Sequence, residues 1–157
     1  MNLPQDFVDL LAEFARFDIR VLVIGGYAVG AHGRPRATKD LDLFLEPLGS
    51  EIRDRACGAL SAFGAPSHVV EALRDAGPSQ VVWFGAPPLR VDLLCTVGGL
   101  DFEAAWQRRL DVTSNEIVIH VVGIDDLLAL KRTAGRPQDL ADIRALRLLG
   151  SRDEQGG

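Results

Sequence analysis

The chain has few cysteines, no excess of basic residues and no long uncharged run. Its two cysteines, Cys57 and Cys95, lie far apart in apolar surroundings without a C-x-x-C partner, which predicts buried reduced thiols rather than a disulfide framework. No uncharged run reaches the roughly 18 residues that a bilayer span requires, and the N-terminal segment lacks the basic start of a secretory signal. We therefore expect a cytoplasmic protein with no membrane partner.

Acidic residues outnumber basic residues by 22 to 17, so the net charge is −5. A field of this sign repels nucleic acid and anionic membranes at long range. Only two lysines are present, Lys39 and Lys131. Any binding to nucleic acid must therefore depend on a local cluster of cations.

The 157 residues, 47% of them hydrophobic, are enough to bury one substantial core. We find no internal repeat and no linker that would separate two domains. The sequence predicts a single domain over residues 1–150 and a disordered polar tail over residues 151–157.

Hydrophobic spacing predicts helices and strands in alternation. Helices are expected at 4–17, 27–31, 50–63, 67–77, 101–110, from 125 onward and again after Pro137, and strands at 21–24, 40–45, 81–84, 89–94 and 117–122. The predicted helix caps are Ser50, Ser67, Asp101 and Asp125. This order predicts an α/β (α+β) fold, in which helices pack on a mixed β-sheet.

A glycine pair, Gly25 and Gly26, stands where the first strand turns into a short helix. Glycine lets a ligand approach the backbone, and the free N–H groups that open a helix favour an anion such as phosphate. The alternative is an ordinary turn with no ligand, because Gly-Gly pairs are common in turns.

Asp40 and Asp42 are two positions apart in a predicted strand, so both side chains leave the same face. Two carboxylates at one point repel each other unless they are solvated or bound to a cation, and hard oxygen ligands favour Mg²⁺. A solvated edge strand is the alternative explanation. It accounts poorly for the basic loop, with Arg36 and Thr38, that comes directly before them.

A third carboxylate, Asp92, lies within an apolar run, where a charge is costly unless it is paired or bound to a metal. If its strand lies beside that of Asp40 and Asp42 in the right register, Asp92 completes a site of three carboxylates. The alternative is an ion pair with Arg90 on the same strand face.

Taken in order, the Gly25-Gly26 turn, the run Arg36-x-Thr38-x-Asp40-x-Asp42 and the later strand residue Asp92 resemble the nucleotidyltransferase superfamily related to DNA polymerase β. The closing segment, 123–143, is similar to the last element of small bacterial nucleotidyltransferases that act as toxins in toxin–antitoxin and abortive-infection systems. The resemblance spans residues 20–147, most of the chain, and implies the nucleotidyltransferase fold.

This resemblance implies that Asp40 and Asp42 hold Mg²⁺, and that Asp92 holds a second ion and favours deprotonation of an acceptor hydroxyl. It implies further phosphate contacts from four residues, Gly25, Gly26, Arg36 and Lys131. Many family members have Gly-Ser at the turn where this chain has Gly26, and Thr38 is a candidate for the missing hydroxyl. A helix-surface cation near a helix C-terminus is the alternative for Lys131.

The activity implied is Mg²⁺-dependent transfer of a nucleoside monophosphate from an NTP, such as ATP, to an acceptor hydroxyl. The preferred acceptor is tRNA or a protein, with an antitoxin as partner. One alternative is an antibiotic acceptor, as in lincosamide and aminoglycoside nucleotidyltransferases. The other is a nucleotide-binding or partner-binding module without turnover. A homodimer or a partner subunit is expected where one short chain leaves too little surface for a large acceptor.

Two further groups of residues leave their roles open. Trp83 and Phe84 are either core residues of a strand or a surface on which a base stacks. Six arginines form either ordinary solvated helix faces or a basic rim for RNA, namely Arg108, Arg109, Arg132, Arg136, Arg144 and Arg147. The three histidines, His32, His68 and His120, are expected to make local hydrogen bonds.

Overall fold

The structure is a computed structural model that describes residues 1–156. These residues form seven helices and a six-stranded mixed sheet, which confirms the predicted fold class. The helices are α1 (Gln5–Arg16), α2 (Gly25–Ala31), α3 (Ser50–Phe63), α4 (Ser67–Asp75), α5 (Phe102–Gln107), α6 (Ile124–Ala134) and α7 (Pro137–Gln155). The strands are β1 (Val21–Ile24), β2 (Asp40–Leu45), β3 (Val81–Phe84), β4 (Arg90–Leu94), β5 (Leu110–Ser114) and β6 (Ile117–Val121).

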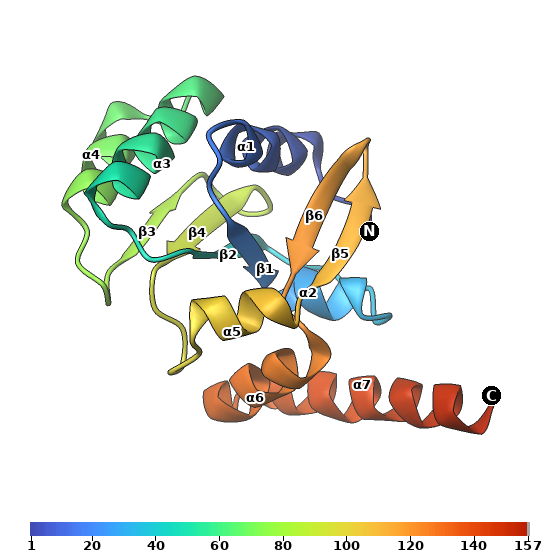
Figure 1. Cartoon of the computed structure of the whole chain (residues 1–157). Helices are drawn as coiled ribbons and strands as arrows, with labels where there is room; N and C mark the ends of the chain where they lie inside the picture. The colour runs from blue at the N-terminus through green and yellow to red at the C-terminus, as the bar shows by residue number, and fades with distance from the viewer. Residues whose placement is uncertain (157) are drawn as a thin grey trace.

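The strand order is β3-β4-β2-β1-β6-β5, with both parallel and antiparallel neighbours. Strand β2 pairs with β1 in the antiparallel direction and with β4 in the parallel direction. In Figure 1, α1, α3 and α4 gather on one side of the central strands, whereas α5, α6 and α7 lie on the other. The central strands therefore have a helix layer on each side.

The core follows from strict alternation along β2. Leu41, Leu43 and Leu45 are fully buried, whereas Asp40 and Asp42 point to the opposite face. Large side chains from α1, from α3 and α4 and from four strands complete the core, namely Phe7, Leu10, Phe14, Leu22, Phe44, Leu60, Leu73, Leu93 and Ile119. Burial of the leucines thus forces the two carboxylates onto one face of the sheet.

Strand β5 was not predicted, because residues 101–110 were assigned to one helix. Helix α5 ends at Gln107, and β5 begins at Leu110 as a mostly exposed edge strand. Asn115 and Glu116 have positive φ values of 48° and 67°, as a two-residue hairpin turn into β6 requires. An exposed strand carries little hydrophobic alternation, so the sequence pattern could not distinguish it from a helix end.

Of the four predicted helix caps, the structure confirms one. Asp101 caps α5, and its carboxylate accepts a hydrogen bond of 2.9 Å from the Ala104 backbone N–H. Ser50 and Ser67 are instead the first helical residues of α3 and α4, and Asp125 lies inside the first turn of α6. These three side chains cap no helix, because each helix begins one or two residues earlier than predicted.

Helix α7 continues to Gln155, into the segment for which the sequence predicts a disordered tail. Residue 157 of that segment lies outside the described part of the chain. None of the helices within residues 1–156 combines the length and the apolar character needed to cross a membrane. The thiols of Cys57 and Cys95 are both free, and burial raises the pKa of each.

Candidate metal and phosphate site

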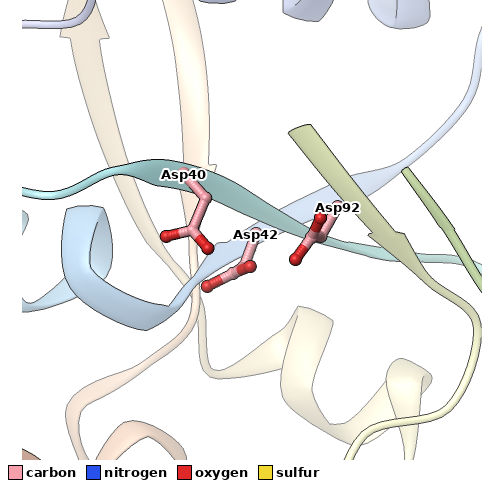
Figure 2. A group of neighbouring side chains, drawn as sticks. All are labelled: Asp40, Asp42 and Asp92. Atoms are coloured by element: carbon pink, nitrogen blue, oxygen red, sulfur yellow. The ribbon is translucent and has the colours of Figure 1, made fainter. Parts of the chain in front are cut away.

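Three carboxylates meet at the boundary between β2 and β4. In the parallel register of these strands Asp42 lies opposite Asp92. Asp40 lies two residues before Asp42 on the same face of β2, opposite Arg90. Each residue offers one carboxylate oxygen, and these three oxygens lie within 4.8 Å of one another (Figure 2). The condition on which the predicted site depended, adjacent strands in the right register, is therefore met.

The carboxyl group of Asp42 lies between those of Asp40 and Asp92 (Figure 2). Burial is the main cause that raises its pKa from 3.8 to about 6, and the negative charges of Asp40 and Asp92 raise it further. Lys131 and Arg136 act in the opposite direction but do not offset this effect. A carboxylate that is costly to ionise in this way is stabilised by a cation, and an all-oxygen donor set of this kind fits Mg²⁺.

Asp92 also has the partner that the alternative explanation required. Arg90 Nε donates a hydrogen bond of 2.8 Å to Asp92 Oδ1. Within residues 1–156, Asp92 Oδ2 accepts no hydrogen bond from another side chain. The ion pair and membership of the carboxylate triad are therefore compatible, because the pair with Arg90 occupies Oδ1 and leaves Asp92 a second oxygen for a cation.

The glycine turn lies directly against the triad. Gly25 has a φ of +69°, which a residue with a side chain rarely adopts, and a Cβ at this position would overlap Asp42 Oδ2. A Cβ at Gly26 would lie 3.1 Å from the side chain of Thr38 and 3.3 Å from Arg36 Nη2. Both glycines therefore allow the backbone of the turn to approach the carboxylates and the basic loop.

Lys131 is a buried ion-pair residue and not the helix-surface cation of the alternative explanation. Its side chain is only 6% exposed, and its Nζ lies 3.0 Å from Asp139 Oδ1 and 3.1 Å from Asp142 Oδ2. Three arginines share these carboxylates: Arg36 and Arg34 contact Asp142 at 3.1 and 3.8 Å, and Arg136 contacts Asp139 at 2.7 Å. Of the four cations that the two aspartates thus hold, Lys131, Arg36 and Arg136 form one wall of the site, here called the cationic wall.

Asp139 and Asp142 were not predicted as functional residues. Burial alone would raise the pKa of Asp139, but hydrogen bonds from Arg136 and Lys131 outweigh burial and lower it to about 2. A signal was present in the sequence, because the two aspartates are three positions apart in a helix and so lie on one face of it. The same face carries Ile143 and Leu146, which are buried. Buried charges at such positions need partners from elsewhere in the fold.

A cavity of about 780 Å³ opens between the triad and this cationic wall. Its lining includes all eight predicted site residues, Gly25, Gly26, Arg36, Thr38, Asp40, Asp42, Asp92 and Lys131, together with Arg136 and Asp139. Apolar side chains complete it, among them Leu94, Leu127 and Leu130. Its volume and mixed lining are typical of a small-molecule site.

Other candidates from the sequence lie elsewhere or are paired. Arg108 forms an ion pair with Asp126 and Arg109 with Asp111, so these two arginines are engaged outside the cavity. His32 Nε2 lies 2.7 Å from the Val122 carbonyl oxygen, a local hydrogen bond as expected.

The neighbouring aromatic residues of β3 divide between core and surface. Phe84 is buried, whereas Trp83 is 54% exposed.

Comparison of the chain with protein-family models finds no matching family, and comparison with curated proteins finds no matching protein.

Proposed function

We propose that the chain is a Mg²⁺-dependent enzyme of the nucleotidyltransferase superfamily, which transfers a nucleoside monophosphate from an NTP to an acceptor hydroxyl and releases pyrophosphate. The observation that carries this proposal is the placement of Asp40, Asp42 and Asp92 around one point, at the mouth of a cavity with a cationic wall. The sequence resemblance adds the order in which these parts occur along the chain.

The three carboxylates match the needs of this reaction. Asp40, Asp42 and Asp92 would hold two Mg²⁺ ions, which activate the attacking oxygen and neutralise the leaving pyrophosphate. The acceptor oxygen forms a bond to the α-phosphorus, the bond from that phosphorus to the oxygen that bridges to the β-phosphorus breaks so that pyrophosphate leaves, and the hydroxyl proton passes by way of Asp92 to solvent. Asp92 is suited to favour this proton loss, because its Oδ2 accepts no hydrogen bond from another side chain within the described chain.

The cationic wall is suited to hold the triphosphate. Arg36, Lys131 and Arg136 are held in place by Asp139 and Asp142, so they need no rearrangement to meet an anion. All three cations line a cavity that the Gly25-Gly26 turn also lines. Thr38 lines the same cavity, and its hydroxyl donates a hydrogen bond of 3.3 Å to the Asp40 carbonyl oxygen.

For the acceptor we propose tRNA or a protein, in a cytoplasmic toxin that is neutralised by an antitoxin. The similarity of residues 123–143 to the toxin-type enzymes supports this choice. An antibiotic acceptor is the second candidate and would use the same carboxylates. A module that binds a nucleotide or a protein partner without turnover is the third. A second copy of the chain or a partner subunit would enlarge the surface offered to a large acceptor.

The first test is transfer of label from each of the four α-labelled NTPs, with Mg²⁺, into total tRNA, whole-cell protein and a panel of antibiotics. Label in tRNA or protein that disappears with EDTA and in the Asp40→Asn/Asp42→Asn double variant would support the proposal. Label on an antibiotic alone would establish the second candidate. No label in any acceptor, with the NTP still bound, would overturn the enzymatic proposal.

Asp92→Asn separates catalysis from binding. An enzyme should lose transfer by several orders of magnitude and keep most of its NTP affinity, whereas a binding module has no turnover to lose. Asp126→Asn is a matched control, because Asp126 is also a mostly buried aspartate paired with an arginine but lies outside the cavity. Equal loss of transfer in both variants would indicate a structural effect and contradict a catalytic role for Asp92.

A further inference from the structure

Trp83 is an exposed aromatic residue placed directly beside the carboxylate triad. In the antiparallel pairing of β3 and β4, Trp83 lies opposite Asp92, so both side chains leave the same face of the sheet. Val82 and Phe84 alternate with it and are buried, whereas the Trp83 side chain is 54% exposed. The burial of its neighbours therefore holds an indole ring at the surface, next to the proposed reaction centre.

Arg90 connects this ring to the triad. Its guanidinium carbon lies 4.3 Å from the centroid of the Trp83 ring, and its Nε donates the 2.8 Å hydrogen bond to Asp92. Both terminal nitrogens of Arg90 are without a hydrogen-bond partner among the side chains and carbonyls of residues 1–156. Trp83, Arg90 and Asp92 thus form a row. Arg90 is held by the indole ring on one side and by the Asp92 carboxylate on the other, and its terminal N–H groups can still donate hydrogen bonds to a ligand.

The strand order places this row across β2 from the Gly25-Gly26 turn. Trp83 on β3 and Asp92 on β4 lie on one side of β2, whereas the Gly25-Gly26 turn follows β1 on the other side. In an in-line displacement the attacking oxygen and the leaving pyrophosphate lie on opposite sides of the α-phosphorus. A triphosphate held at the Gly25-Gly26 turn therefore directs the acceptor to the side where Trp83 is exposed.

We propose that Trp83 and Arg90 form the acceptor subsite and that it takes an unpaired nucleobase, so that the acceptor is single-stranded RNA. This inference rests on the proposed function and assigns the acceptor side of that same site. The base stacks on the exposed part of the indole, and the free guanidinium nitrogens of Arg90 contact a phosphate of the strand. The 3′-hydroxyl of the stacked nucleotide then faces Asp92.

Distance and charge favour this ligand. Directly opposed residues of an antiparallel pair have Cβ atoms roughly 5 Å apart, which is about one sugar ring, so a single nucleotide can stack on Trp83 and reach Asp92. Arg90 places a guanidinium over the ring, and its terminal nitrogens are suited to contact a phosphate of an RNA strand.

The test measures binding, so it does not depend on turnover. A labelled single-stranded RNA octamer is titrated with the protein in Mg²⁺ and a non-hydrolysable α,β-methylene NTP analogue, and the titration is repeated with an octamer whose 3′-terminal base is absent. Trp83→Ala should weaken binding of the intact octamer on the order of 5-fold to 100-fold. It should leave binding of the abasic octamer and of the NTP analogue unchanged, and Trp83→Phe should restore most of the affinity.

Val118→Ala is the matched control, because Val118 is a similarly exposed hydrophobic residue on β6, at the other end of the sheet. Four results would overturn the subsite: no RNA binding by the natural chain, equal affinity in Trp83→Ala, equal weakening by Val118→Ala, or conversion of a dimer to a monomer by Trp83→Ala. The last result would mean that Trp83 covers a protein interface.

Failure of the subsite and failure of the proposed function give different results. Label transfer into RNA that persists undiminished in Trp83→Ala would refute the subsite and leave the enzyme intact. RNA binding that depends on Trp83 and on the terminal base, without transfer to any acceptor, would support a base-binding site at Trp83 and refute the enzymatic function, and with it the acceptor role of that site.

Discussion

Gly25 packs against the carboxylate of Asp42 so closely that a Cβ on Gly25 would overlap Asp42 Oδ2. Gly25 opens α2 directly after β1, and Asp42 lies on the antiparallel neighbour β2, opposite Ile24, the last residue of β1. The glycine turn and the central carboxylate of the triad are therefore one structural unit.

Gly25→Ala should disturb this unit. The positive φ and the overlap with Asp42 both oppose a side chain, so we expect the free energy of unfolding to fall by about 1–3 kcal/mol and Mg²⁺ binding to weaken. Urea unfolding and calorimetric titration with Mg²⁺ measure the two effects. Gly150→Ala is the control, since Gly150 lies in α7 with open space around it and should tolerate alanine. Unchanged stability of Gly25→Ala would mean that the turn can move away from Asp42.

Gly26→Val should weaken NTP binding with little effect on the metal. A Cβ here already lies 3.1 Å from Thr38 and 3.3 Å from Arg36, so the larger side chain displaces the basic loop from the cavity. The expected result is a loss of NTP affinity of about tenfold or more, equivalent to about 1.4 kcal/mol. Equilibrium binding of a fluorescent NTP analogue measures it. An unchanged affinity would remove Gly26 and the loop from the phosphate site.

The raised pKa of Asp42 makes stability depend on pH. This pKa is about 6 in the folded chain against an ordinary 3.8, so the folded state binds more protons than the unfolded state between these values. The free energy of unfolding therefore falls as the pH rises from about 4 to 6. Asp42→Asn removes this dependence and should be more stable than the natural chain at pH 7, by at most about 3 kcal/mol.

Unfolding of both proteins across pH 4 to 7.5, in EDTA, measures the difference. Addition of Mg²⁺ should stabilise the natural chain and not Asp42→Asn, because only the natural chain retains all three carboxylates. A variant that is less stable at every pH would show that Asp42 has a structural role that outweighs its repulsion.

Asp142→Asn should destabilise the chain and disorder the cationic wall. Asp142 is fully buried and pairs with both Arg36 and Lys131, so its neutralisation removes the acidic partner of Arg36 and leaves Lys131 with Asp139 alone. Breaking such a network costs about 3–5 kcal/mol. Thermal unfolding and NTP binding report the two effects. Asp18→Asn is the control, because the Asp18 side chain is 94% exposed and its pair with Arg55 should contribute little. Similar small effects in both variants would contradict a central role for Asp142.

Local patterns were sufficient for most of the fold. The limits of β1 and β2 were predicted correctly, because an apolar run closed by glycines and a strict alternation of aspartate and leucine leave few alternatives. The exposed strand β5 was missed, because its sequence has neither feature. Three of four capping residues were displaced by one or two positions, because the exact start of a helix depends on the chain that leads into it.

By itself the sequence determined that Asp40 and Asp42 share one strand face, because side chains alternate along a strand whatever it packs against. Only the tertiary structure decided that Asp92 lies opposite Asp42, since strand register depends on how the whole sheet assembles. It also decided that Lys131 lies between Asp139 and Asp142, and that Trp83 is exposed beside the triad while Phe84 is buried. Charge partners and exposure depend on residues distant in the sequence, and folding brings those residues together.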